Sequence, residues 1–263
     1  MRTRFILSFI AALFMQFTTV SADNYTDGLM KLMNNEAVAI INTKMLELKE
    51  TPQSSNINAE YFKNQVKIDA VEWMADHYRK NMSEKDFNDF ISFFMQPEIL
   101  SVQKKAISAA TSGEGEELTQ ILLPLIRTIT TGGTLESPKE PECDPLLKKE
   151  LLRWMEINSV SEGLKAVMGT AKSLAADRVP ADIPEEQKTM AIKTMEKTFS
   201  YLEDNMTSIV LAMMIGKVDL KDMQILNAIE NKPFFASYKK ANLSMASDIS
   251  TFMNKVVAGM KKN

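Results

Sequence analysis

The sequence predicts an all-α protein built from two similar helical units. Apolar residues recur along the chain at spacings of three and four, and no window keeps the alternation of period two that a strand needs. Glycine and proline, which interrupt helices, number only nine each in 263 residues. A composition of 45% hydrophobic and 25% charged residues excludes a disordered or collagen-like chain and is enough for one large domain or two small ones.

Residues 1–22 have the three parts of a secretory signal peptide. Two arginines give a positive start, an apolar run covers residues 5–15, and Val20-Ser21-Ala22 supplies the small-residue cleavage pattern. The alternative, a retained membrane anchor, is disfavoured because the run is too short to cross a hydrocarbon core of about 30 Å. We therefore expect cleavage after Ala22, a periplasmic or secreted mature protein, and no membrane span after that cleavage.

The first unit, residues 23–130, begins with two amphipathic segments. Each carries one apolar stripe, which a helix must bury against other helices. The stripes consist of Leu29, Leu32, Met33, Ile40, Ile41, Met45 and Leu48 in the first segment, and of Phe62, Val66, Val71, Met74 and Tyr78 in the second. Residues 51–56, a polar stretch with a proline, separate the two as a loop.

A third helix is expected to begin at Ser83, whose hydroxyl can cap a free backbone N–H while Asp86 reaches back as in a capping box. Pro97 ends this helix and suits the first turn of a fourth. A fifth helix, from Glu116 to about Thr130, contains Pro124 and should be kinked or broken there. The buried face of the third helix is predicted to consist of Phe87, Phe90, Ile91 and Phe94.

Residues 131–145 are predicted to link the two units, because they contain two glycines, three prolines and few apolar residues. The second unit, residues 146–263, resumes helical spacing at about Leu146, with a break near residues 177–184. The long stretch from residue 184 to residue 215 is compatible with one helix or with two.

The two units align with each other. At a shift of 136 residues the helix cap, the apolar spacing and the proline break all recur. The matched pairs are Ser83 with Asp219, Asp86 with Asp222, Phe87 with Met223, Phe90 with Leu226, Phe93 with Ile229, and Pro97 with Pro233. Further upstream, Leu29 aligns with Leu151 at a shift of 122 residues. Any two amphipathic helices look alike, but the shared cap and the shared proline favour an internal duplication.

The repeated pattern resembles that of exported bacterial proteins with the domain of unknown function 2059. The residues that fit this pattern are Tyr78, Ser83, Asp86, Phe87, Phe90, Phe93, Phe94 and Pro97 in the first unit, and more loosely Asp219, Asp222, Met223, Leu226 and Pro233 in the second. The chain departs from it at Ile99 and Phe235, where the family has a glycine, and at Ile229-Glu230, which replaces the aromatic pair. The resemblance covers about half of each unit. It implies an exported helical protein and no particular activity.

Charge and residue counts exclude several kinds of site. Once Arg2 and Arg4 leave with the signal peptide, 29 basic residues face 34 acidic ones, a net charge of -5, which argues against a nucleic-acid partner. One cysteine and one histidine exclude a disulfide framework, a cysteine-rich zinc site and any site that needs two imidazoles. We therefore predict no catalytic residues, no metal ligands and no cofactor.

Three candidates for chemistry have a simpler structural interpretation. His77 could act as a general base only beside a positioned nucleophile or metal, and its neighbours in sequence point to other sides of the helix. Cys143 is a candidate nucleophile or bridge to another chain, but the adjacent Glu142 and Asp144 oppose a thiolate. The glutamates of residues 114–117 lack the spaced ligands of a calcium site and are typical of a helix start.

Methionine is the compositional exception, with 19 residues spread over both units. Methionines fill helical cores, line adaptable binding surfaces or bind copper, and no Met/His cluster favours the last. We expect a non-enzymatic interaction module that binds a protein segment or an apolar ligand through a Met/Phe-rich groove. The alternatives are a structural or assembly component that self-associates and, third, an enzyme with an unrecognised carboxylate site.

Overall fold

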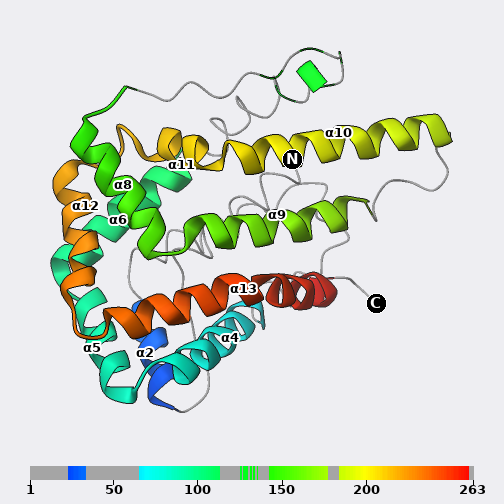
Figure 1. The fold of residues 1–263 in the computed structure, drawn as a ribbon. Coiled ribbons are helices and arrows are strands. Elements are labelled where there is room, and N and C mark those ends of the chain that lie inside the picture. The colour runs from blue at the N-terminus through cyan, green and yellow to red at the C-terminus, as the bar shows by residue number, and fades with distance from the viewer. Residues whose placement is uncertain are drawn as a thin grey trace.

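The computed structural model describes residues 23–33, 65–112, 125, 127–129, 131, 133, 135, 142–176 and 184–260. Every regular element within these ranges is helical, apart from an isolated β-bridge between Ile215 and Val218, so the predicted all-α class is confirmed (Figure 1). The elements are α2 (Asn24–Met33), α4 (Val66–Asn81), α5 (Glu84–Phe94), α6 (Pro97–Ser112), α8 (Pro145–Ile157), α9 (Val160–Ala176), α10 (Glu185–Asp204), α11 (Met206–Met214), α12 (Leu220–Asn227), the 3₁₀-helix η4 (Ala228–Asn231) and α13 (Phe235–Met260).

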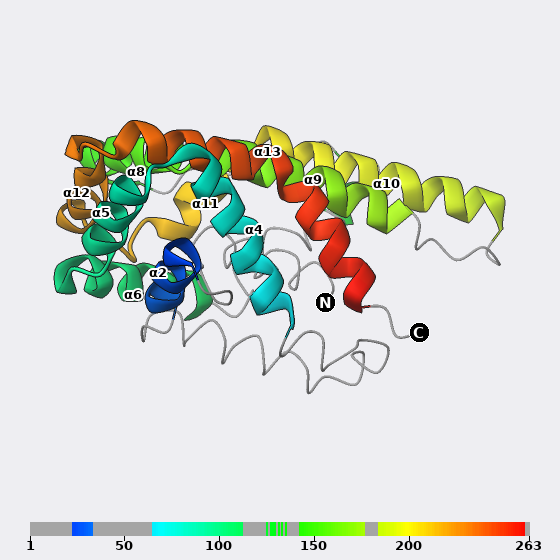
Figure 2. The ribbon, with the colours of Figure 1, turned by 90° about the horizontal axis from the view of Figure 1, so that it is seen from below.

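Four long helices lie side by side in the order α10, α9, α13, α4 (Figures 1 and 2). The helices α5, α6, α8 and α12 gather at one end of this layer, with α11 packed on α6 and α2 packed on both α4 and α5. Neighbours in this layer come from distant parts of the sequence, because α4 of the first predicted unit lies against α13 of the second.

Side-chain caps fix where several helices begin. The Ser83 hydroxyl accepts a hydrogen bond from the backbone N–H of Asp86 (3.1 Å) at the start of α5, as predicted. At the start of α12, Asp219 and Asp222 form a complete capping box, with N–H to carboxylate distances of 2.9 and 3.0 Å. Asp144 accepts from the backbone N–H of Leu146 (2.8 Å) and so caps α8. Each helix start therefore satisfies a backbone donor that the helix itself leaves unpaired.

Most helix boundaries fall where the sequence places them. Pro97 is the first residue of α6, α8 begins at Pro145, and α9 ends at Ala176 before α10 begins at Glu185. The stretch from 184 to 215 forms two helices that are broken at Asn205. Pro233 differs from its counterpart Pro97, since it precedes α13 by two residues instead of starting it.

Some predicted features lie outside the described residues. These are most of the fifth helix with Pro124, most of the linker, the glutamates of residues 114–117, and the apolar positions Ile40, Ile41, Met45, Leu48 and Phe62. Within α5, Phe87, Phe90 and Ile91 are buried as predicted, whereas Phe93 takes the buried place expected of Phe94, which is half-buried.

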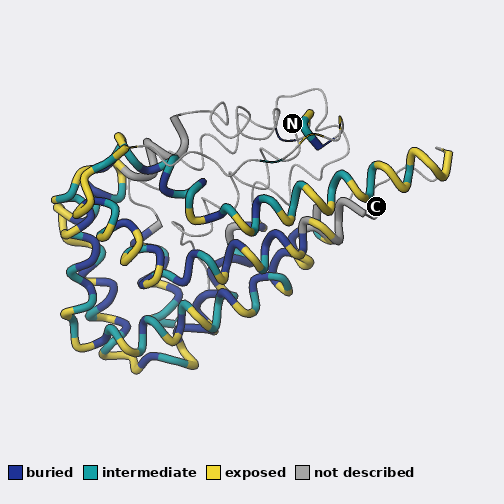
Figure 3. Tube along the Cα trace, turned by 45° about the horizontal axis from the view of Figure 1, so that its top comes forward, coloured by how far each residue is buried: buried dark blue, intermediate teal, exposed yellow. Residues whose placement is uncertain are grey.

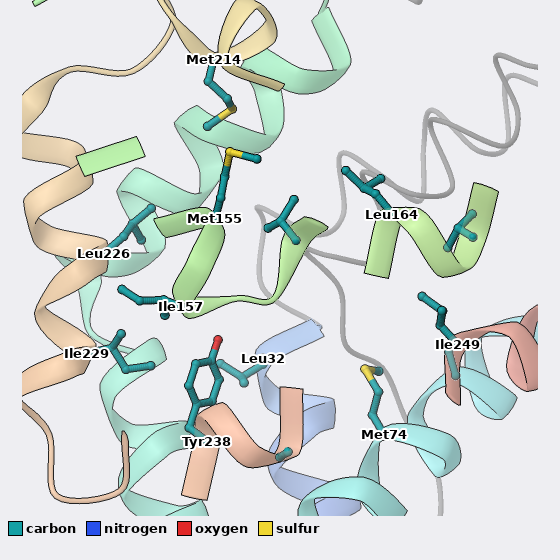
Figure 4. Close-up of a cluster of buried hydrophobic side chains, with 14 of the residues drawn as sticks. Leu32, Met74, Met155, Ile157, Leu164, Met214, Leu226, Ile229, Tyr238 and Ile249 are labelled. Carbon is teal, nitrogen blue, oxygen red and sulfur yellow. The ribbon is translucent and has the colours of Figure 1, made fainter. Parts of the chain in front are cut away.

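The two predicted units contribute to one continuous hydrophobic core (Figure 3). An aromatic cluster joins α5 to the start of α13, where the Phe90 and Tyr238 rings stack with centroids 5.4 Å apart and the Phe93 and Phe234 rings meet edge to face at 6.2 Å. Figure 4 shows Met155 of α8 and Met214 of α11 pointing toward each other elsewhere in this core. The junction between the matched segments is thus filled with buried side chains.

Candidate functional site

The two capped helices sit in comparable surroundings. At the start of α5, the Asp86 carboxylate accepts a hydrogen bond from the Ser237 hydroxyl of α13 (3.3 Å). At the start of α12, Lys105 of α6 pairs with Asp219 (3.0 Å) and with Asp222. Since the shift of 136 residues matches α5 with α12 and α6 with α13, each capped helix is contacted by the second helix of the other pair.

Burial follows the same alignment. Phe87 and its match Met223 are both 0% exposed, and Leu29 and Leu151 are 0% and 1% exposed. The contacts behind the two capped helices also correspond. In the first unit, Gly28 of α2 lies against Ile91 of α5, since a Cβ on Gly28 would be only 2.9 Å from the Ile91 side chain. Glu150 and Asn227 occupy the matched positions in the second unit, and the Asn227 side-chain amide donates to the backbone carbonyl of Glu150 (2.9 Å). Of the predicted motif residues, Phe87 and Phe90 are buried in the core, and the polar ones lie at the capped starts of α5 and α12.

His77 lies in a polar cluster that joins α4 to α13. Its Nδ1 lies 2.8 Å from the Ser244 hydroxyl, and its Nε2 lies 3.2 Å from an oxygen of Asp248. The Trp73 indole N–H donates to that same Asp248 oxygen (2.8 Å), and its ring meets His77 edge-on. The order serine, histidine, aspartate is the one that general-base activation of a serine requires.

The surroundings of Ser244 favour a structural role for this cluster. Ser244 lies in the interior of α13, where backbone N–H groups are committed to helical hydrogen bonds and none is free to stabilise an oxyanion. Burial opposes the charge on Asp248, but hydrogen bonds from Trp73, Thr251 and His77 prevail and lower the pKa of Asp248. An ionised Asp248 therefore holds Trp73 and His77 in place and fixes α4 against α13.

Converging carboxylates in the described chain are bridged by cations. Arg79 contacts both Asp23 and Asp76, and Lys105 contacts both Asp219 and Asp222. Hydrogen bonds from the Asp222 backbone and from Lys105 lower the pKa of Asp219. A carboxylic acid that donates a proton near neutral pH needs the opposite shift. Among the described residues, no group of three or more histidine, cysteine, aspartate or glutamate side chains is placed to hold a metal ion.

The remaining sequence candidates are not brought together. Cys143 is half-buried just before α8, and it is a free thiol. Most of the described methionines belong to the core, which supports the core interpretation. Those buried are Met74, Met82, Met155, Met168, Met206, Met214, Met223 and Met253.

The helix α10 is the main exception to this burial. None of its residues before Leu202 is buried, although Ile192, Met195 and Phe199 continue an apolar stripe at helical spacing (Figure 3). Ile192 and Met195 are half-buried and do not pack against the core, whereas Phe199 does. Met190 is 60% exposed but lies on the opposite side of the helix. We call Ile192, Met195 and Phe199 the α10 surface. Sequence analysis missed it because an apolar stripe by itself predicts burial.

A pocket of about 660 Å³ lies at the carboxyl end of this surface. One wall is apolar and comes from Ile129, Gly133 and Leu135. The other wall comes from the last turns of α10 and from the break that follows it, and is made of Glu196, Lys197, Ser200, Tyr201, Asp204 and Asn205. The pocket combines apolar and polar groups and is open to solvent.

Comparison with models of protein families, with curated proteins and with solved structures found no match. Among the described helices, none combines the length and the apolar character that a bilayer span requires.

Proposed function

We propose that this chain is an exported, non-enzymatic interaction protein that binds an apolar protein segment or ligand along the α10 surface and its adjoining pocket. The observation that carries the proposal is the exposure of α10, a helix of 20 residues in which only Leu202 is buried. An apolar stripe that a protein leaves partly exposed is a candidate interaction site. A methionine and a phenylalanine in the stripe suit an adaptable apolar contact.

The packing supports a second part of the proposal, that the chain arose by duplication of one helical unit. Two capped helices at matched positions have matched buried residues, and each is contacted by the later helix of the other pair. In this proposal the paired units form a rigid support, and α10 is the element that the support presents. Membership of the family with domain of unknown function 2059, and export to the periplasm or beyond, stay predictions of the sequence.

Titration of the mature chain, residues 23–263, with the hydrophobic dye anilinonaphthalene sulfonate tests the binding proposal. The double substitution Ile192→Glu with Met195→Glu should abolish most of the fluorescence increase, because two charges would then lie in the apolar stripe. The matched control is Leu243→Glu on α13, since Leu243 is also an exposed apolar residue (53%) away from α10. Equal dye binding by both variants and the parent chain would contradict a site on α10.

Sedimentation velocity over a range of protein concentrations separates a foreign partner from self-association. If the α10 surface pairs with a second copy, the sedimenting mass should double as concentration rises, and the double glutamate variant should remain monomeric. A parent chain that stays monomeric while it binds the dye supports a site for another molecule.

A further inference from the structure

One edge of the α10 surface is lined by glutamates. Glu196 comes four residues after Ile192 and three before Phe199, so its side chain lies beside both on the helix. Glu203 follows Phe199 by four residues and continues the same edge. Glu196 is exposed and Glu203 is half-buried. Since α10 is the outermost helix of the layer, with α9 as its neighbour (Figure 1), a molecule that covers the apolar stripe would meet both carboxylates.

The cations of α10 do not neutralise these two carboxylates. Lys188 is in line with the α10 surface, four residues before Ile192, but its ammonium pairs with Glu185 (4.0 Å). Lys193 and Lys197 directly follow Ile192 and Glu196 in sequence and so face another side of the helix. Among the residues that the structure describes, no lysine or arginine forms an ion pair with either glutamate. The edge of the α10 surface therefore keeps an excess of negative charge.

The adjoining pocket has the same bias. Its polar wall contains the carboxylates of Glu196 and Asp204 but a single cation, Lys197. Asp204 is exposed and has no cationic partner within the described ranges. Ile129 and Leu135 supply the apolar wall. Glu196 thus belongs both to the edge of the α10 surface and to the pocket, and places a negative group between two apolar areas.

We propose that the partner of the α10 surface is a cationic amphipathic segment of another protein, in which lysine or arginine flanks an apolar stretch. The inference rests on the proposed function, because it names the occupant of the same surface. The apolar side chains of this segment cover Ile192 and Met195, and its cations lie beside Glu196 and Glu203. Opposite charges at the rim of an interface speed association and reject partners of the wrong sign.

Charge disfavours a second copy of this chain as the occupant. The α10 surface of a second copy carries the same two glutamates, and like charges brought together at an interface weaken it. The whole chain is also acidic, with 34 acidic and 31 basic residues. A basic segment therefore gains from electrostatic attraction at a surface where a second copy is repelled.

Two labelled synthetic peptides of equal length test the proposal on the unaltered chain. Both have leucine at helical spacing, and the remaining positions are lysine in one peptide and glutamate in the other. Fluorescence anisotropy should show that the Leu/Lys peptide binds about tenfold more tightly, and this advantage should shrink in 1 M salt, where the screening length is about 3 Å. Equal affinities, or tighter binding of the Leu/Glu peptide, would overturn the inference and leave an apolar site on α10 in place.

Two variants of equal net charge locate the effect. Glu196→Gln with Glu203→Gln should weaken binding of the Leu/Lys peptide about fivefold, because each exposed ion pair contributes modestly. The control, Glu72→Gln with Glu98→Gln, removes two exposed carboxylates from α4 and α6 and should leave the affinity unchanged. Circular dichroism checks that both variants are folded. Equal affinities for the two variants would show that the attraction comes from the net charge of the protein and would overturn the inference.

The variant Ile192→Glu with Met195→Glu distinguishes failure of this inference from failure of the proposed function. It should abolish binding of the dye and of the Leu/Lys peptide. Dye binding that this variant abolishes, in a chain that does not bind the Leu/Lys peptide, would overturn the inference alone. Dye binding that this variant leaves intact would overturn both. A dimer in sedimentation velocity that this variant dissociates would make a second copy the occupant and overturn the inference.

Discussion

At the scale of single residues, Ser159 has an unusual backbone conformation. It joins α8 to α9 with φ of 50°, in the left-handed region that favours glycine, and it is only 4% exposed. The tight turn allows α9 to begin at once after α8, since the Ser159 carbonyl accepts from the N–H of Gly163 (3.0 Å). The connection between α8 and α9 is so short that Ser159 has to adopt this strained conformation.

We predict that Ser159→Gly raises the free energy of unfolding by about 0.5–1 kcal/mol, because glycine adopts positive φ without strain. Urea denaturation followed by circular dichroism measures the change. The control is Ser161→Gly in the first turn of α9, which should lower the same quantity by a few tenths of a kcal/mol, as expected for glycine in a helix. A loss of stability in Ser159→Gly would show that the turn depends on the serine side chain.

His77→Ala should lower the free energy of unfolding by about 2 kcal/mol, because it leaves Ser244 and Asp248 without their shared partner in a buried interface. Dye binding at α10 should be unchanged, since His77 lies on α4, at the far side of the helix layer. Glu72→Gln, at an exposed position on the same helix, provides the control. Covalent labelling of Ser244 by a fluorophosphonate reagent would contradict the structural role of the cluster.

The sequence could identify His77 as a helical residue but could not supply its partners. Ser244 and Asp248 are 167 and 171 residues away, and no periodic pattern relates α4 to α13. The sequence predicted structure more reliably where the cause lies within a few residues, as it does at the start of a helix. Ser83 and Pro97 sit at helix starts as predicted, because caps and prolines act within one turn.

At the scale of whole elements, the caps of α2 and α12 make stability depend on pH. Burial opposes ionisation of Asp23, but bonds from Thr26 and Arg79 prevail and lower the pKa of Asp23. The pKa of Asp219 is lowered by its bonds to Asp222 and Lys105. A carboxyl whose pKa is lower in the folded chain stabilises the fold above its ordinary value of 3.8. That contribution is lost as the pH falls below this value towards the folded pKa.

Tm should therefore be nearly constant from pH 7 to about pH 5 as far as these two groups are concerned, and should fall steeply below pH 4. The double variant Asp23→Asn with Asp219→Asn should show a shallower acid slope, because asparagine caps a helix without titrating. Differential scanning calorimetry between pH 3 and pH 7 measures both slopes. Parallel curves for the parent and the double variant would exclude a role for these caps in acid unfolding.

The helix α10 shows the limit of periodicity at this scale. Its apolar spacing correctly predicts a helix, and the side chain of Leu202 is buried as the pattern requires. The same pattern cannot say that Ile192 and Met195 remain outside the core, because exposure depends on which helices lie nearby. The break at Asn205 also lacked a proline or glycine signal, which is why one helix and two were equally compatible with the sequence.

At the scale of the whole molecule, the matched segments share one core and should not unfold separately. Phe90→Ala in α5 removes a fully buried ring that contacts Phe234 and Tyr238, and it should cost about 3–5 kcal/mol. Native-state hydrogen exchange should show equal loss of protection in α5 and in α12 and α13. Loss confined to residues 65–112 would mean that the two units fold as independent domains.

The central claim, an exported support that presents α10 to a partner, is tested most directly by photo-crosslinking in cells that export the chain. A benzophenone side chain is placed at position 195 on α10 and, in a second variant, at position 243 on α13, which is exposed but outside the α10 surface. Position 195 should give a discrete adduct in the exported fraction, and position 243 should give none. No adduct from position 195, or the same adducts from both positions, would contradict the claim.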